Sequence, residues 1–284
     1  MNYNDILLES AKKSGNITCM GLDPKVEVLP EGMGLTQYFQ TLFNEMLKKN
    51  LIPAAFKPNI GYYQSLDKPR EGIYKGSIAL SSVLDMIDIY FPGIPVILDS
   101  KRGDIARSSL NYEIEAFTCW KADAVTVSPY MGTDSVSPFQ VEGKGIYVLN
   151  RTSNPGGKDL QNLLIDDGMP LYLKVSQKIV EWSEGNKGLG AVVGATSMKE
   201  LSEISSFYSN KEIPMLIPGV GAQGGSATDV IKALNETGYP LHLARINSSS
   251  GLTHPWKKGV APENWLELCT ASISELLKET KVTF

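Results

Sequence analysis

The sequence predicts a (β/α)8 barrel, the TIM-barrel fold, formed by a single domain that spans residues 1–284. Eight short apolar runs, rich in β-branched residues and bounded by turn residues, recur along the chain with helix-like stretches between them. The runs do not alternate with polar residues, as expected for parallel strands that are covered on both faces. Eight such units favour a closed barrel, with an open doubly wound sheet as the alternative.

The predicted strands are short, and each ends in turn or polar residues. They lie at 16–23, 53–59, 95–101, 123–129, 145–152, 189–196, 215–221 and 241–247. The predicted helices lie at 34–50, 75–91, 108–120, 197–209 and 227–238, the last with Gly238 as its C-terminal stop. An N-terminal helix (about 1–14) and a C-terminal helix (about 262–280) are expected to pack on the barrel.

Composition limits the classes of function. The formal net charge of -4 gives no basic surface for nucleic acid or anionic lipid, so an anionic ligand would have to be bound locally. The chain begins without a signal-peptide pattern and has no long apolar span, which predicts a cytoplasmic protein. Three scattered cysteines favour a reducing compartment. The two histidines, His242 and His254, have no clustered partners, so we expect no zinc site and a structural or surface role for both.

Charged residues end the second and third predicted strands. Asp99 and Lys101 are two apart in "PVILDSKRGDI" and should share a strand face, whereas Arg102 points away and Asp104 follows Gly103. Barrel enzymes carry their catalytic groups at this end of the strands, although a surface ion pair is the simpler interpretation of so short a motif. Lys57 lies in an apolar run, where an ammonium requires carboxylates nearby.

Two later strand ends could bind a polar ligand. "PGVGAQGG" (218–225) follows the seventh run, and barrels often bind phosphate on backbone amides there. "NRTSNPGG" (150–157) follows the fifth run and offers the polar side chains of Thr152, Ser153 and Asn154. A helix cap and turn is an equally good interpretation of the second segment.

Taken together, these segments resemble the orotidine 5'-phosphate decarboxylase family, in its longer type 2 branch. "DSKRGDI" is similar to the family's D-x-K-x-x-D-I signature, "AFKPNIGYYQ" to its second-strand lysine segment and "LIPGVGAQGG" to its phosphate loop. "VVGATS" and "TVSPYMGTD" add to the resemblance, which runs from about residue 16 to about residue 250. It implies a carboxy-lyase that converts orotidine 5'-monophosphate to UMP without metal or cofactor, in the last step of de novo pyrimidine synthesis.

The resemblance also implies residue roles. Lys101 would protonate C6, Asp99 would lie beside the substrate carboxylate, and Lys57 and Asp104 would complete the charged array, with Asp104 donated by the other subunit of a homodimer. Asp23 matches the ribose contact, Ser153 the pyrimidine contact, and Gln223 with adjacent amides the phosphate site. The other substrate-binding residues expected are Asn59, Ser108, Asn154, Pro155, Gly221, Gly224, Arg245, Ser249 and Ser250.

Two positions depart from the family pattern. The family usually has an arginine in a context like "INVSRGI", but this chain reads "INSSSGL", with Ser250 at the arginine position. Either Arg245 replaces that arginine from another direction, or amides and hydroxyls of Ser248 to Ser250 bind more of the phosphate. Ser108 stands where the family has a threonine and keeps the hydroxyl.

Three alternative functions remain open. A magnesium-dependent sugar-phosphate enzyme of the same barrel type, such as a hexulose-phosphate synthase, has a similar D-x-K-x-x-D motif. A Schiff-base aldolase could use Lys57 or Lys101 as its nucleophile. A barrel that only binds nucleotides is the non-enzymatic alternative, favoured by the missing arginine.

Overall fold

Eight parallel strands form one sheet that curls into a nearly closed barrel, as predicted. The computed structural model describes residues 1–165, 167–221, 224–256 and 258–284. The strands are β1 (Thr18–Gly21), β2 (Ala55–Lys57), β3 (Ile97–Arg102), β4 (Ala124–Val127), β5 (Gly145–Arg151), β6 (Leu189–Val193), β7 (Met215–Ile217) and β8 (Ala244–Ser248). Their order is β2-β1-β8-β7-β6-β5-β4-β3. Every residue of β1, β2, β4, β6, β7 and β8 is buried, which explains why the runs are continuously apolar.

The two outer strands of that order, β2 and β3, meet through isolated bridges. Phe56 pairs with Val96 and Asn59 pairs with Asp99, both in parallel. The Phe56 amide donates to the Pro95 carbonyl at 3.0 Å, and the Asp99 amide donates to the Pro58 carbonyl at 2.9 Å. These contacts bring the ends of β2 and β3 together, so the alternative of an open doubly wound sheet is wrong.

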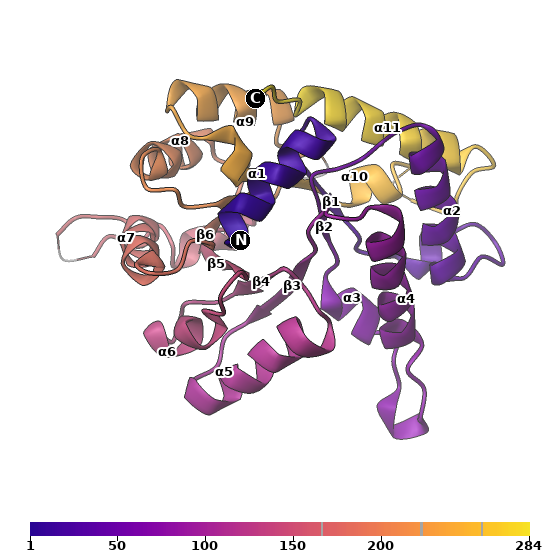
Figure 1. Cartoon of the computed structure of the whole chain (residues 1–284), viewed down its shortest axis with the longest axis horizontal. Helices are drawn as coiled ribbons and strands as arrows, with labels where there is room; N and C mark the ends of the chain where they lie inside the picture. The colour runs from indigo at the N-terminus through magenta and orange to yellow at the C-terminus, as the bar shows by residue number, and fades with distance from the viewer. Residues whose placement is uncertain (166, 222–223, 257) are drawn as a thin grey trace.

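The helices surround the barrel (Figure 1). The longer ones are α1 (Tyr3–Ser14), α2 (Leu35–Lys48), α4 (Lys75–Tyr90), α5 (Ala106–Glu113), α7 (Leu171–Ser183), α8 (Met198–Tyr208), α9 (Ala227–Glu236) and α11 (Trp265–Glu279). The short ones are α3 (Ile60–Gln64), α6 (Thr133–Val136) and α10 (Ser250–Thr253). Gly238 follows α9 with a φ of 67° and its amide donates to the Asn235 carbonyl, so it ends this helix as predicted.

Helix α1 lies across the end of the barrel where the strands begin (Figure 1). Asn2 and Asp5 cap its start reciprocally, and Gly15 ends it in the left-handed conformation. The Tyr3 side chain packs where a β-carbon on Gly145 or Gly188 would collide with it, so these glycines allow the helix to sit close to β5 and β6. The barrel is therefore closed at this end and open only at the other.

Two helical segments differ from the sequence prediction. Helix α7 was not predicted, because its buried face includes the polar Ser176, which interrupts the apolar stripe; the Ser176 hydroxyl accepts from Asn150 Nδ2 at 2.7 Å. The predicted helix at 108–120 begins as α5 and continues as a π-helical turn over Ile114–Cys119. Glu115 in this turn accepts two hydrogen bonds from Arg102, so Arg102 points away from the barrel mouth, as predicted.

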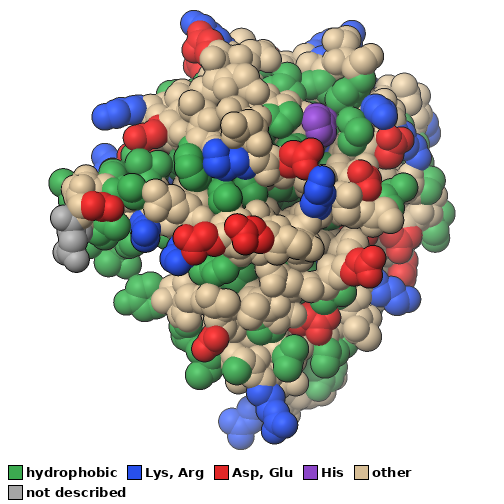
Figure 2. Space-filling view, turned by 60° about the vertical axis from the view of Figure 1, so that its left-hand side comes forward, with side chains coloured by type: hydrophobic (Ala, Val, Ile, Leu, Met, Phe, Trp, Pro, Cys, Tyr) green, Lys and Arg blue, Asp and Glu red, His purple; other side chains and the backbone are tan. Residues whose placement is uncertain are grey.

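The surface shows no segregation of charge on the face in Figure 2, where acidic and basic side chains are interspersed. Among the described residues, no helix combines the length and the apolar character needed to cross a membrane.

Candidate active site

A cavity of about 620 Å³ opens at the carboxyl ends of the strands. This volume suits a small ligand, and the position is the one that barrel enzymes use for catalysis. Of the residues predicted for the site, nine line the cavity together with Ser248 and Thr152: Asp23, Lys57, Asn59, Asp99, Lys101, Ser153, Asn154, and the pair Ser249 and Ser250 that follows β8. The structure thus brings together predicted residues from the carboxyl ends of β1, β2, β3, β5 and β8 and from the segments that follow them.

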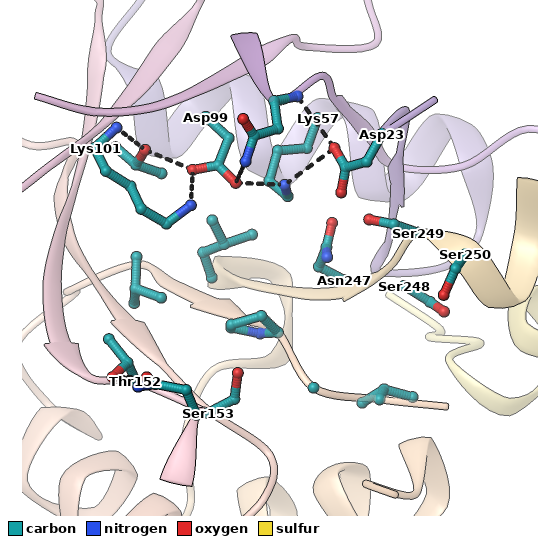
Figure 3. A pocket seen from close by; sticks show the side chains of 18 of the residues that line it. Asp23, Lys57, Asp99, Lys101, Thr152, Ser153, Asn247, Ser248, Ser249 and Ser250 are labelled. Atoms are coloured by element: carbon teal, nitrogen blue, oxygen red, sulfur yellow. Dashed lines mark hydrogen bonds and ion pairs between the residues drawn. The ribbon is translucent and has the colours of Figure 1, made fainter. Parts of the chain in front are cut away.

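Lys57, Asp99 and Lys101 form a row along one wall (Figure 3). Asp99 Oδ2 lies 2.7 Å from Lys57 Nζ, and Asp99 Oδ1 lies 2.6 Å from Lys101 Nζ. Lys57 and Asp99 are buried, whereas the Lys101 side chain is 48% exposed and faces the open cavity. The carboxylates expected near Lys57 are present, since Asp23 Oδ1 is also 4.0 Å from its Nζ. One buried carboxylate thus bridges two ammonium groups that both line the cavity, and that of Lys101 is by far the more exposed.

Charge pairing outweighs burial in this row. Burial alone would raise the pKa of the Asp99 carboxyl, but Lys57 and Lys101 hold that pKa below its usual range. Burial likewise lowers the pKa of Lys57, and Asp23 and Asp99 more than reverse this, so its pKa stands above the ordinary lysine value. Lys57 and Asp99 are therefore both charged at neutral pH.

A bulge in β3 directs Lys101 into the cavity. The register between β3 and β4 shifts between Leu98 and Arg102, and Lys101 has a φ of 48°, in the left-handed region. Thr126 Oγ1 accepts from the amides of Ser100 and Lys101, each at 3.0 Å, and donates to Asp99 Oδ1 at 2.9 Å. Asp99 and Lys101 share a side as predicted, but a bulge held by Thr126 replaces the regular alternation of the strand.

The Asp23 side chain is positioned by the segment after β2. Asp23 Oδ1 accepts from the Asn59 amide at 3.1 Å, and Asn59 Nδ2 contacts Asp99 Oδ2 at 3.4 Å. The Asp23 side chain is 17% exposed and lies in the wall at the far end of the row from Lys101 (Figure 3). Its free oxygen can accept hydrogen bonds from a hydroxylated ligand.

Ser248, Ser249 and Ser250 form the end of the cavity next to Asp23, which we call the serine end (Figure 3). A β-carbon on Gly21 would lie 1.8 Å from Ser249 Oγ, so glycine is required there for β1 to pass beneath this side chain. Ser248 Oγ lies between Gly221 and Gly251, whose β-carbons would stand 3.4 and 3.2 Å from it. The serine end thus adjoins the glycine-rich loop after β7.

The end of β5 forms the opposite wall, with Thr152 and Ser153 (Figure 3). The Ser153 backbone passes so close to Gly194 that a β-carbon there would lie 2.7 Å from it. Thr196 Oγ1 donates to the Ser153 carbonyl at 2.9 Å, and Gln161 Oε1 accepts from the Thr152 amide at 2.9 Å. This strand end is therefore held in place from β6 and from the segment that follows β5.

Other predicted residues do not line the cavity. Asp104 and Ser108 lie beyond the end of β3; Asp104 Oδ1 accepts from the Ile105 amide at 2.7 Å, and Ser108 is exposed on α5. Pro155 begins a 3-10 turn beside the cavity. The Gly221 and Gly224 amides donate to carbonyls within their own turn, and neither glycine lines the cavity, whereas Gly219 and Val220 do. The prediction for Gln223 falls outside the described residues.

Arg245 corrects the prediction most clearly. It is fully buried in β8, and its guanidinium donates to the Leu7 carbonyl and Ser10 Oγ of α1, each at 2.6 Å, and to the Ala244 and His242 carbonyls. These contacts place its guanidinium at the barrel end that α1 closes. Asn247, two residues later on the same face of β8, lines the cavity at the other end of the barrel. Arg245 is therefore not the substitute for the missing phosphate-binding arginine.

We expect Arg245→Ala to lower the free energy of unfolding by about 3 kcal/mol. The substitution leaves a cavity and removes the hydrogen bonds that the guanidinium donates to the Leu7 carbonyl and Ser10 Oγ of α1. Chemical denaturation measures this free energy, with the exposed Arg70→Ala as the control. A loss of stability no larger than that of Arg70→Ala would contradict this structural role of the guanidinium.

Sequence reasoning missed several residues that line the cavity: Lys25, Tyr62, Thr126, Gln161, Asn247 and His254. Thr126 lies in "TVSPYMGTD", a segment that entered the sequence analysis only through the resemblance. A polar residue in the middle of the apolar run 123–129 was the signal that could have indicated it. His254 was expected to be structural or at the surface, yet it is 4% exposed and lines the cavity, where its amide donates to the Ser250 carbonyl.

The fold and the cavity are those of a barrel enzyme. The cavity holds a buried lysine-aspartate row and a hydroxyl-rich end suited to a small anionic ligand. A family model described as the orotidine 5'-phosphate decarboxylase / HUMPS family matches residues 71–238. An orotidine 5'-phosphate decarboxylase of Cupriavidus metallidurans is 41% identical over 251 residues, which cover 86% of this chain and 88% of that protein. The chain belongs to this family.

Solved structures agree with this assignment. The structure of an OMP decarboxylase from Leishmania donovani is similar with a TM-score of 0.74 and 30% identity, and the match covers 100% of both chains. A UMP synthase structure from the same organism gives a TM-score of 0.76 and 32% identity, where the match covers 97% of this chain and 56% of that one. The similarity therefore extends over nearly the whole chain described here.

Proposed function

We propose that this protein is a carboxy-lyase that converts orotidine 5'-monophosphate to UMP and carbon dioxide, the last step of de novo pyrimidine synthesis. The observation that carries the proposal is the buried Asp99 carboxylate, which lies within 2.7 Å of both Lys57 Nζ and Lys101 Nζ in the cavity. Similar proteins carry the name orotidine 5'-phosphate decarboxylase and match most of the chain. The cytoplasmic location predicted from the sequence stays a prediction.

The order of groups around the cavity fits one orientation of this substrate. The pyrimidine ring lies between Lys101 on one wall and Ser153 on the other, so the ring carboxylate meets the charged row (Figure 3). The ribose hydroxyls reach Asp23 and Lys57, and the phosphate reaches the serine end. Binding of the remote phosphate then holds the reacting carbon beside Lys101, which is how distant contacts contribute to rate.

In the reaction, the bond between C6 and the carboxylate carbon breaks and carbon dioxide leaves, while the bonding electron pair stays on C6. The Lys101 ammonium stabilises this developing negative charge and then transfers one proton to C6. The product is UMP, and the neutral Lys101 amine regains its proton from solvent. Asp99 fixes the Lys101 ammonium in place, and Lys57 keeps Asp99 ionised from the other side.

The same geometry bears on the three alternatives. Lys57 is held protonated by two carboxylates, which disfavours a role as a Schiff-base nucleophile. Both oxygens of Asp99 already accept from ammonium groups, which compete with a magnesium ion for the same lone pairs. A protein that only binds nucleotides gains nothing from a buried charge row, which is expensive to desolvate.

The test is loss of the orotate absorbance when purified protein is mixed with orotidine 5'-monophosphate in EDTA. We expect stoichiometric UMP, the same rate with and without chelator, and no borohydride-trapped adduct with a sugar phosphate. The sugar-phosphate alternative would replace this proposal if the protein turned over a hexulose phosphate only in the presence of magnesium and did not turn over orotidine 5'-monophosphate.

We also propose that the protein acts as a homodimer in which Asp104 completes the partner's site. Among the described residues, the Asp104 carboxylate forms no ion pair with Lys57 or Lys101 of its own chain, which leaves it available to another chain. Apolar side chains that are about half exposed or more follow it in the chain (Ile105, Leu110 and Ile114) or precede α6, a helix that contacts α5 (Tyr130 and Met131). A second copy that covers these side chains would bring Asp104 to the mouth of the neighbouring cavity.

Mixing Asp104→Ala protein with Lys101→Ala protein should restore activity that neither variant has alone. Each hybrid dimer contains one intact site, so a random mixture should recover about a quarter of the wild-type rate. Steady-state turnover measures the recovery, and mass spectrometry of the mixed dimers confirms that subunits exchange. Subunit exchange without recovered activity would contradict a shared site.

A further inference from the structure

His254 is a buried titratable side chain in the cavity that the mechanism above does not use. It follows α10, its amide donates to the Ser250 carbonyl at 3.0 Å, and only 4% of the residue is exposed. The Trp256 ring packs against the imidazole edge-on, with 6.4 Å between ring centroids. His254 is therefore held beside the serine end by its own backbone and by a neighbouring aromatic ring.

One nitrogen of this ring has a partner and the other does not. Thr253 Oγ1 donates to the Ser249 carbonyl at 3.1 Å, which commits its only proton, and it lies 2.9 Å from His254 Nδ1. Nδ1 must therefore carry a proton and donate it to Thr253. Nε2 is buried and has no hydrogen-bond partner among the described residues. A buried polar atom without a partner, in the lining of a cavity, points to a ligand.

The serine end needs a positive charge if it binds a phosphate group. Ser248, Ser249 and Ser250 offer only neutral hydroxyls, and Arg245 lies at the opposite end of the barrel. Of the four basic side chains that line the cavity in the described part of the chain, Lys57 and Lys101 are paired with Asp99. Among the described residues that line the cavity, Lys25 and His254 are the basic side chains left to balance the charge of an anion at this end, and the charge of Lys25 acts on the His254 ring.

We propose that His254, in its protonated form, donates Nε2–H to the substrate phosphate, and that Lys25 provides the second positive charge at the serine end. This inference rests on the proposed function, because it assigns the phosphate of that substrate to this end of the cavity. His254 and Lys25 would then replace the arginine that the family usually carries at the position of Ser250.

The protonation state of the ring makes this contact dependent on pH. Burial, and after it the positive charge of Lys25, lower the pKa of His254 below the ordinary value, while Asp23 and Glu27 oppose this shift. In the free protein at neutral pH the imidazole ring is therefore neutral, and its Nε2 carries a lone pair and no proton. A phosphate dianion stabilises the imidazolium, so binding takes up one proton, and affinity falls as pH rises above the pKa of the free ring.

The test is titration calorimetry of UMP and of uridine, which lacks the phosphate, with wild-type protein, His254→Gln and His242→Gln. His242 is the matched control, because it lies in the 3-10 turn before β8, at the other end of the barrel. For the wild type, we expect UMP binding to weaken about tenfold between about pH 7 and about pH 8.5, where the phosphate is already a dianion. In His254→Gln, UMP should bind about tenfold more weakly at about pH 7 and show little pH dependence, because a neutral donor replaces a charged one. Uridine binding should change little in either variant.

Proton uptake by the wild type gives a second readout that needs no variant. Calorimetry in two buffers of different ionisation enthalpy should show uptake of a proton on UMP binding and none on uridine binding. Equal proton uptake for both ligands, or equal weakening of UMP and uridine in His254→Gln, would overturn the proposal. Wild-type protein that binds UMP with proton uptake but does not decarboxylate orotidine 5'-monophosphate would refute the proposed function and leave this inference standing.

Discussion

Lys101→Ala should lower kcat by about 10⁴-fold or more, because it removes both the proton donor and the charge that faces the carbanion. The variant should fold, since Asp99 keeps its 2.7 Å contact with Lys57. It should also bind UMP with a Kd close to that of the wild type, because the ribose and phosphate contacts lie elsewhere in the cavity. Turnover and calorimetry measure the two quantities separately.

Lys121→Ala is the matched control for this substitution. Lys121 is also a lysine with a left-handed backbone, at a φ of 53°, but it is exposed outside the cavity. We expect it to turn over at the wild-type rate. Appreciable decarboxylation by Lys101→Ala would remove this residue from the role of proton donor.

Asp99→Asn should affect both turnover and stability. The substitution keeps the shape of the side chain but leaves the buried Lys57 ammonium with Asp23 at 4.0 Å as its remaining carboxylate. Loss of one partner of a buried pair costs about 3 kcal/mol or more. Without the carboxylate, Lys101 is no longer held at the reacting carbon, and we expect kcat to fall by about 10³-fold.

The pH dependence of unfolding separates the charge of Asp99 from its shape. Because Lys57 and Lys101 lower the pKa of Asp99 in the folded protein, its stabilisation is complete above the pKa of an ordinary aspartate and is lost as pH falls through the lowered value. The difference in unfolding free energy between the wild type and Asp99→Asn should therefore shrink in acid. Asp134→Asn, an exposed aspartate on α6, is the control. A difference that is independent of pH would mean that Asp99 acts through packing alone.

Much of the barrel could be predicted because its strands are buried on both faces. All eight runs became strands, and Lys57, Asp99 and Lys101 stood out because a charge at the end of a buried run must be paired. Pattern alone gave the position of these residues, and the resemblance gave their roles. Helix α7 was not predicted because Ser176 on its buried face is polar. Its burial depends on a hydrogen bond with Asn150, and a local sequence pattern contains no information on such a contact between segments.

The contacts at the phosphate end could not be predicted in the same way. Arg245 and Asn247 lie on one face of one strand, and only the position of α1 decides that Arg245 is on the closed side of the barrel. His254 lies beyond the strand, and its orientation depends on the turn of α10 and on Thr253. These outcomes depend on packing between distant segments, for which the sequence has no short-range signal.

The central claim is that C6 of orotidine 5'-monophosphate loses carbon dioxide directly and receives its proton through Lys101. Turnover in D2O, followed by proton magnetic resonance of the UMP formed, tests it most directly. The claim predicts UMP with deuterium at C6 and an unchanged proton at C5, because no step touches C5. Deuterium at C5, or no UMP from folded wild-type protein, would contradict it.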